Sequence, residues 1–381
     1  MVDGSAQRAA GEPAGPVNIA QLDVGNFPTT PAPMGVAGSK TQGAIAEGHR
    51  LANYVTGPWE VDPSLVSGAM TSGLVLKSSG ALTLALAAEM ASIPSGSSMV
   101  AGFHAWRKNA NNAALEHTVL VFPDGEVAKT AAREFSDGAA AINGGSGSAH
   151  TIAGRPDTTA VAGTMELAGQ PPVPRVTAVT AHERYVVIDS ARSPDGIEAA
   201  SAMVNKVLDL QLPLLDKFTP TDPAKLADLP VDATGLLART LPIDISRATV
   251  NSRAVYERRG ALHFQTDPVA AAQRWEKSGM TSQAISDGSV TENRDGEAAE
   301  QLLKDLVKEV RDKEQGQPAA PVKQMETNSQ CLKLPGGTSG SPRPSAWCVA
   351  TAGRYLIANQ SGQLLETQQK VAAQYAMLMA S

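Results

Sequence analysis

Six histidines are the side chains best suited to acid–base chemistry, and they are scattered singly along the chain. They are His49, His104, His117, His150, His182 and His263. The chain has no His-Glu-x-x-His, no Cys-x-x-Cys and no Asp-rich calcium loop, which are spacings typical of metal sites. It also lacks the Gly-x-Ser-x-Gly that presents a nucleophilic serine in α/β-hydrolases. We therefore expect no metal, no cofactor and no catalytic residue.

The tightest polar cluster is His182-Glu183-Arg184-Tyr185, at a predicted hairpin turn. Arg354-Tyr355 lies at a second predicted hairpin, so matched structural hydrogen bonds or ion pairs are the alternative to a binding role. Trp59 stands between two prolines, where its indole either anchors a loop on the core or lines a ligand cleft. The candidate ligand-binding residues are Trp59, Glu60, His182, Arg184, Tyr185, Arg354 and Tyr355.

The two cysteines, Cys331 and Cys348, flank a loop rich in Gly, Pro and Ser. A disulfide closing a loop of this size would stabilise the fold by about 3 kcal/mol. Two reduced, buried thiols are the alternative. A metal site is disfavoured, because two cysteines without a histidine in the same segment do not complete four ligands. We predict the disulfide.

The composition indicates a chain with few charges and many loops. Only 18% of the 381 residues are charged, below the roughly 25% of average domains. Two domains are expected at this length, because single cores stop growing at about 250–300 residues. The net charge of −6, without a basic stripe, argues against a nucleic-acid partner. No apolar run approaches the roughly 18 residues of a membrane-spanning helix.

Apolar periodicity predicts the elements that must position the candidate residues. Helices are expected at 41–54, 81–91, 126–135, 197–210, 269–277, 297–313 and from 363 to the C-terminus. Strands are expected at 17–27, 103–107, 115–122, 176–180, 184–189, 261–264 and 325–334, and in a hairpin over 347–357. The Gly-rich stretch 139–172 lacks the Gly-Lys-Ser/Thr ending of a phosphate-binding loop. We expect it to be a mobile loop.

An internal repeat organises these elements. Residues 119–122 and 131–135 parallel 261–264 and 271–275, and the hairpin at 180–187 parallels the one at 351–357. The repeat predicts an α+β fold of two related ferredoxin-like sandwich units, with antiparallel sheets and helices on one face. Chance similarity in an Ala-rich chain is the alternative. The expected division is a tether at 1–16, a domain at 17–216, a Pro-rich linker at 217–243 and a disulfide-containing domain at 244–381.

Three stretches resemble a family of actinobacterial cell-envelope lipoproteins, of mycobacterial and nocardial type and uncharacterised function. They are Leu22–Pro31, Tyr54–Pro63 and the C-terminal stretch from Cys348 through Arg354-Tyr355 to Tyr375. The resemblance implies an exported, extracytoplasmic protein that is lipidated at an N-terminal cysteine. Because this sequence contains neither that cysteine nor a signal peptide, lipid anchoring is an expectation for the full-length precursor only.

These observations favour a non-catalytic binding protein of the cell envelope. Its expected partner is an apolar envelope lipid or glycolipid, or an envelope protein, held in an interdomain cleft. A core that contains Met and few aromatic residues can adapt to irregular apolar ligands. Two alternatives stay open. One is a hydrolase or acyltransferase acting on envelope esters, and the other is a pocketless scaffold subunit with an exposed apolar patch.

Overall fold

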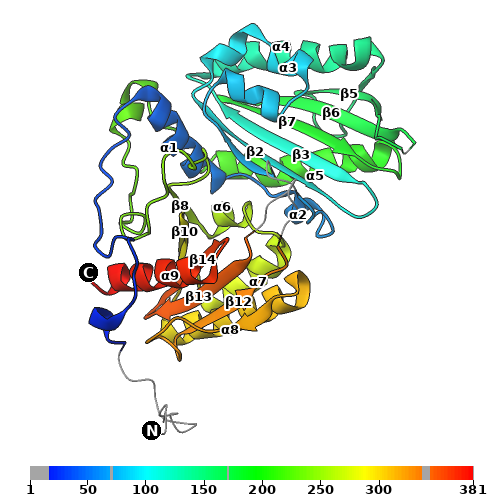
Figure 1. The fold of residues 1–381 in the computed structure, drawn as a ribbon. Coiled ribbons are helices and arrows are strands. Elements are labelled where there is room, and N and C mark those ends of the chain that lie inside the picture. The colour runs from blue at the N-terminus through cyan, green and yellow to red at the C-terminus, as the bar shows by residue number, and fades with distance from the viewer. Residues whose placement is uncertain (1–16, 69–71, 170, 337–343, 381) are drawn as a thin grey trace, which may run out of the picture. The chain divides into compact units, whose positions relative to one another are not determined.

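The computed structural model describes residues 17–68, 72–169, 171–336 and 344–380 and contains two antiparallel seven-stranded sheets with helices packed on them (Figure 1). The predicted α+β class is confirmed. The larger compact unit comprises Pro33–Ala238 and Pro242–Ser286, and the smaller comprises Met1–Ala32, Arg239–Leu241 and Asp287–Ser381. The units interleave along the chain, unlike the linear division expected from the sequence. The predicted tether at 1–16 lies outside the described residues.

The first sheet belongs to the larger unit and has the strand order β1-β2-β3-β7-β6-β5-β4. Its strands are β1 (Gly73–Leu76), β2 (Ala101–Lys108), β3 (Ala114–Val121), β4 (Ser148–His150), β5 (Thr158–Met165), β6 (Val173–His182) and β7 (Tyr185–Arg192). The central strands β3 and β7 pair over eight residues, from Ala114 opposite Arg192 to Val121 opposite Tyr185. This pairing aligns the alternating apolar residues of both strands on common faces.

Helices cover both faces of this sheet, whereas one face was expected. Helix α4 (Gly125–Gly145) buries Ala131 and Phe135 against Val186 and Ile188 of β7. Helix α5 (Ile197–Leu215) lies on the other face, where its Gln211 bonds to His117 of β3. Because side chains alternate along a strand, His117 and Ile188 point to opposite sides, and Figure 1 shows α4 and α5 on either side of the sheet.

The rest of the larger unit is built from short elements. They are α1 (Lys40–Ala52), α2 (Pro58–Val61), η2 (Ser79–Leu84), α3 (Ala88–Ala91), η3 (Pro94–Ser98), η4 (Pro223–Asp228), β8 (Ala254–Glu257), α6 (Arg258–Leu262), α7 (Pro268–Ser278) and β9 (Ser282–Ser286). The outer edge of β1 is capped by one side chain. Asn251 accepts from the backbone N–H of Val75 and donates to the carbonyl of Gly73, so both exposed backbone groups are satisfied.

The second sheet has the strand order β11-β12-β13-β14-β10-β9-β8. Its strands in the smaller unit are β10 (Gly288–Glu292), β11 (Gln317–Ala319), β12 (Ser329–Lys333), β13 (Ala346–Ala352) and β14 (Tyr355–Ser361). Helices α8 (Gly296–Glu314) and α9 (Leu364–Met379) pack on β13 and β14, and η1 (Ile19–Gln21) precedes them. Cys331 and Cys348 face each other across β12 and β13 and form the predicted disulfide. The pairing register brings their Cα atoms to 4.1 Å.

The two sheets repeat one topology. Read from its other end, the second sheet runs β8-β9-β10-β14-β13-β12-β11, which matches the first strand for strand. In both, a helix follows the third strand (α4, α8) and another follows the seventh (α5, α9). An internal duplication was therefore predicted correctly, although each sheet has more strands than the four of a ferredoxin-like unit.

The predicted alignment of the two repeats is correct for their hairpins but wrong for the strand and helix that precede them. The hairpins at 180–187 and 351–357 are equivalent as predicted, being β6–β7 and β13–β14. Residues 261–264, however, are not the counterpart of β3, because 258–262 form helix α6. The true match is Asp124-Gly125-Glu126 with Asp295-Gly296-Glu297, where each Asp caps the helix that follows.

Several other elements also differ from those predicted. Residues 17–27 contain the turn η1 instead of a strand, and 81–91 divide between η2 and α3. Helix α5 continues to Leu215 through Pro213 instead of stopping before it. The stretch 139–172, expected to be a mobile loop, contains β4 and β5. The Gly and Thr residues of β5 concealed its weak alternation.

Candidate functional site

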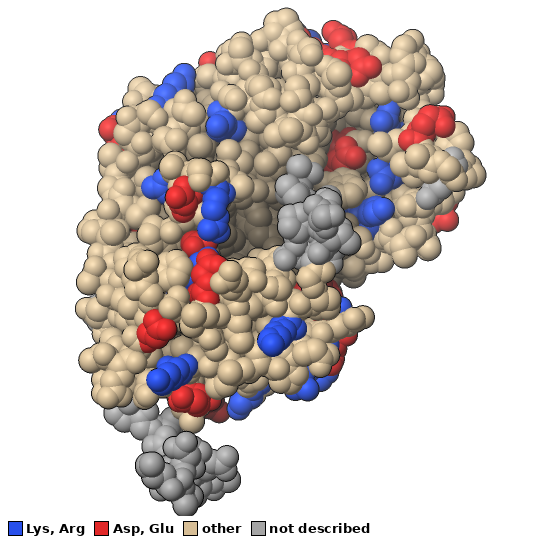
Figure 2. Space-filling view, in the orientation of Figure 1, with Lys and Arg blue, Asp and Glu red and all other residues tan. Residues whose placement is uncertain are grey.

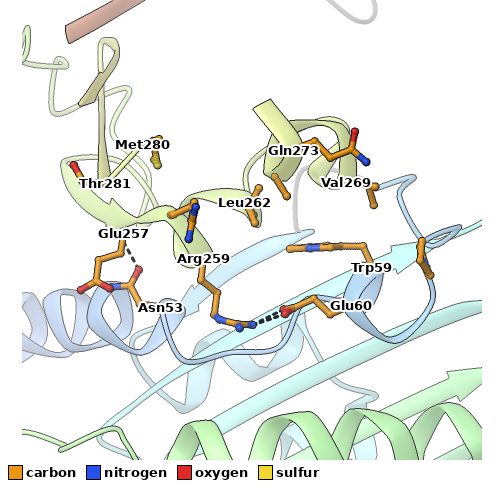
Figure 3. A pocket seen from close by; sticks show the side chains of 13 residues that line it. Asn53, Trp59, Glu60, Glu257, Arg259, Leu262, Val269, Gln273, Met280 and Thr281 are labelled. Carbon is orange, nitrogen blue, oxygen red and sulfur yellow. Dashed lines mark hydrogen bonds and ion pairs between the residues drawn. The ribbon is translucent and has the colours of Figure 1, made fainter. Parts of the chain in front are cut away.

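A pocket of about 760 Å³ lies within the larger unit, between α2, α6 and α7 (Figure 3). Its volume falls in the range of roughly 300–1,000 Å³ that is typical of small-molecule sites. The lining residues are Asn53, Trp59, Glu60, Pro63, Glu257, Arg258, Arg259, Leu262, Val269, Ala272, Gln273, Met280 and Thr281. They include no Ser, Cys or His.

Helix α2 presents Trp59 and Glu60 to the pocket, and its start explains why. Pro58 occupies the first turn, where a missing N–H has no cost. The Glu60 carboxylate accepts from the backbone N–H of Gly57 at 2.8 Å, which closes the turn. A Cβ on Gly57 would lie 2.2 Å from the Trp59 ring. Glycine is therefore required for the indole to fold back onto its own helix start.

The opposite wall is the α6–α7 pair, and its turns are specified by the sequence. The Asp267 carboxylate accepts from the N–H of Ala270 at 2.9 Å and caps α7, which starts with Pro268. Gly279 ends α7 in the left-handed conformation that glycine adopts without strain. This N-cap and this C-cap fix where Val269 and Met280 meet the cavity.

The pocket is amphipathic. Figure 3 shows Trp59, Leu262 and Val269 gathered on one side and Asn53, Glu257 and Arg259 toward the other. The charged residues Glu60 and Arg259 form an ion pair, with the Arg259 Nη1 2.6 Å and 2.5 Å from the two carboxylate oxygens. The side chains of this pair are 29% and 36% exposed, so the pair faces the cavity and remains in contact with solvent.

A buried cation supports the apolar wall from behind. Arg107 of β2 is 3% exposed and donates to the carbonyls of Val66, His263 and Gln265 at 3.0, 2.9 and 2.8 Å. Its guanidinium also lies 5.7 Å from the centre of the Trp59 ring. Burial lowers the pKa of Arg107 to about 10, with the charge of Asp267 opposing the shift. The side chain therefore stays charged at neutral pH and holds α2 and the α6–α7 turn together.

The predicted site residues are not all brought together. Trp59 and Glu60 line the pocket. His182 instead pairs with Asp216 at 2.7 Å, and the Tyr185 hydroxyl donates to the carbonyl of Phe218. Neither residue lines the pocket, and neither does Arg184.

Arg354 and Tyr355 lie in the smaller unit. Arg354 pairs with Glu292 at 2.7 Å, and the guanidinium groups of Arg239 and Arg354 lie 5.1 and 5.4 Å from the Tyr355 ring centre. The carbonyls of Arg184 and Arg354 accept from the backbone N–H groups of Phe122 and Asn293, respectively. These equivalent bonds are matched structural contacts in the two repeats.

The histidines also have structural partners. His117 is fully buried, with Nδ1 2.6 Å from Asp189 Oδ1 and Nε2 2.8 Å from Gln211 Oε1. The N–H of Thr56 donates to the same Gln211 oxygen, so that oxygen is an acceptor and His117 Nε2 carries a proton. Burial raises the pKa of Asp189, while the charge of His117 and the hydrogen bond to it oppose the shift. This network joins α5 to the sheet.

A serine–histidine contact is present away from the pocket. His150 Nε2 lies 3.1 Å from the hydroxyl of Ser201 in α5, which is 8% exposed. No carboxylate is seen to orient this imidazole among the contacts of the described residues. Among the described residues, no group of three His, Cys, Asp or Glu side chains is placed to hold a metal ion. No helix of the described residues is both long enough and apolar enough to span a membrane.

Sequence reasoning missed most of the pocket. Arg258, Arg259 and Leu262 lie on α6, whereas the sequence predicted a strand at 261–264 and no element for the two arginines. The Arg258-Arg259 pair next to a Gly was the available signal. This signal could not identify a site, because the partner of Arg259 is Glu60, which is distant in the sequence.

The chain belongs to a family of domains of unknown function. The family model for the N-terminal domain, "Domain of unknown function (DUF7373) N-terminal", matches residues 34–231, and that for the C-terminal domain matches residues 236–381. A search of curated proteins finds no match. Among solved structures, the extracellular domain of PknH from Mycobacterium tuberculosis is similar at 15% identity and a TM-score of 0.29, over 42% of this chain and 93% of that chain. A likeness this weak carries no argument about function.

Proposed function

We propose that this protein is a non-catalytic binding protein of the cell envelope and that the pocket of the larger unit holds a small amphipathic molecule. The observation that carries the proposal is the pocket itself, which combines an apolar wall with charged and amide groups. Sites of this kind bind the apolar body of a ligand and orient it through a few polar groups. The proposal places the ligand within one unit and not in the interdomain cleft expected from the sequence.

The nature of the lining favours binding over covalent catalysis. Nucleophilic catalysis commonly pairs a Ser or Cys with a His base, and the lining contains none of these three residue types, with Thr281 as its hydroxyl-bearing residue. Glu60 is held by Arg259 and by its own helix start. A carboxylate held in this way has a fixed orientation and is suited to orienting a ligand.

An extracytoplasmic location is part of the proposal. The Cys331–Cys348 disulfide is typical of proteins that fold in oxidising compartments outside the cytoplasm. Lipid anchoring in a longer precursor, and an envelope lipid as the ligand, follow from the family resemblance and complete the proposed function.

Native mass spectrometry with organic extraction tests the proposal. Protein purified gently from an actinobacterial host is expected to carry a stoichiometric amphipathic molecule. Ala272→Trp, which fills the pocket from α7, should abolish this adduct. Glu276→Trp on the exposed face of the same helix should retain it. An adduct that persists in Ala272→Trp would place the ligand elsewhere. A bare mass for the unchanged protein would contradict the carrier function.

A further inference from the structure

A small polar basin lies at the far end of the first sheet, away from the pocket. It is formed by Arg175 and Thr177 of β6, Thr164 of β5, and Asn143, Ser146 and Gly147 from the turn after α4. We call it the Arg175 basin. The Gly-rich turn is the same stretch in which the sequence showed no phosphate-loop motif, and here it is ordered against the sheet.

Backbone geometry explains why glycine is needed in this turn. After Ile142 the chain leaves the helical conformation, and Asn143 and Gly144 have φ values of 56° and 68°. A Cβ on Gly147 would lie 2.5 Å from the side chain of Val161. The turn can therefore approach β5 closely only with glycine at this position, which brings its polar groups beside Arg175.

Arg175 is the central charge of the basin. It is half-buried, and among the residues that the structure describes its guanidinium makes no hydrogen bond and no ion pair. Its cross-strand neighbour Arg192 is 7% exposed and is occupied with the carbonyl of Asn112 and, at 3.9 Å, with Glu116. Burial lowers the pKa of Arg175, while Glu116 and Glu89 oppose the shift from a distance. Glu116 therefore pairs with Arg192 and only influences Arg175 from farther away.

The lining complements a negative charge. Ser146, Thr164 and Thr177 line the basin together with Arg175, and no Asp or Glu is part of the lining. Charge-assisted hydrogen bonds from guanidinium and hydroxyl groups are a common way to hold phosphate and sulfate. The open space is about 10 Å³, close to that of one water molecule. A ligand could therefore insert only one or two oxygens, and the rest of it would remain outside.

We propose that the Arg175 basin binds a tetrahedral oxyanion, a phosphate or sulfate that is either free or the terminal group of a larger molecule. This site is separate from the proposed ligand pocket and does not depend on it. A structural role is the competing explanation, because Arg175 also lies near the C-terminal end of α4, where a positive charge is favourable.

Isothermal titration calorimetry at constant ionic strength tests the proposal with sodium phosphate and with glycerol 3-phosphate. We expect Arg175→Gln to weaken binding by about tenfold or more, the usual effect of losing a charge-assisted bond. Arg253→Gln, at an exposed arginine with no partner among the described residues, should bind like the unchanged protein. Binding of both anions would point to a phosphoryl group on a larger ligand, and binding of inorganic phosphate alone would point to the free anion.

Two results would overturn the proposal. One is the absence of phosphate binding by the unchanged protein. The other is equal affinity in Arg175→Gln, which would leave Arg175 with its helix-end role alone. If Arg175→Gln does not fold, Thr177→Val keeps the guanidinium and removes one hydroxyl, and we expect it to weaken phosphate binding several-fold. Unchanged affinity in a folded Thr177→Val would also count against the basin.

Discussion

Replacing Arg107 with methionine should destabilise the larger unit and open its pocket. Methionine is shorter than arginine but keeps an unbranched apolar stem, and it removes every donor. Three backbone carbonyls, those of Val66, His263 and Gln265, would then lose their charged donor in a buried setting. Each buried acceptor left without a partner costs about 1–3 kcal/mol.

The net magnitude is smaller than the sum of these terms. The fold no longer has to bury a cation, a cost that is visible in the lowered pKa of Arg107. Backbone relaxation will also let water reach some of the carbonyls. We therefore expect a loss of about 2–5 kcal/mol in the free energy of unfolding. Arg107→Lys should recover only part of it, because an ammonium cannot direct its donors to three carbonyls in one plane.

Urea unfolding followed by intrinsic fluorescence and by circular dichroism measures this loss. Trp59 is expected to report on it directly, since its ring lies beside the guanidinium. Arg258→Met is the matched control. Its arginine is exposed at the pocket and makes no hydrogen bond or ion pair among the described residues, so its effect should stay within about 0.5 kcal/mol. A loss below about 1 kcal/mol for Arg107→Met, or full recovery in Arg107→Lys, would refute the reasoning.

Two further predictions concern the disulfide and the buried histidines. Replacing both Cys331 and Cys348 with serine should lower the free energy of unfolding of the smaller unit by about 3 kcal/mol, given a sequence separation of 17. Equal urea midpoints for the variant and the oxidised protein would contradict this. Burial lowers the pKa of His49 to about 4 and of His104 and His263 to about 3, from an ordinary 6.5. Below pH 6.5 the unfolded chain therefore binds protons that the folded chain does not. Stability should be fully present above that pH and should fall toward pH 4 by about 1.4 kcal/mol per pH unit for each histidine. Equal stability at pH 7 and pH 5 would show that these imidazoles are not buried in their neutral form.

The sequence by itself determined the elements whose signals are local. Helix α8 has an apolar stripe at helical spacing, and α7 begins at Asp267-Pro268 and ends at Gly279, so their positions required no knowledge of distant residues. The hairpin of β13 and β14 and the Cys331–Cys348 bridge could likewise be predicted from short-range alternation and spacing. The equivalence of the β6–β7 and β13–β14 hairpins could be predicted from the same local patterns.

The tertiary structure decided what depends on contacts between distant residues. Residues 258–262 form a helix because Arg259 meets Glu60 and because Gly260 allows the Asn53 side chain to approach to a distance that a Cβ would block. The side of the sheet that each helix covers was settled by pairing register, which no local pattern records. The pocket assembles Trp59 from α2, Leu262 from α6 and Met280 from after α7. Apolar residues of these types are usually core residues. They line a pocket here only because the fold brings them together around an unfilled space.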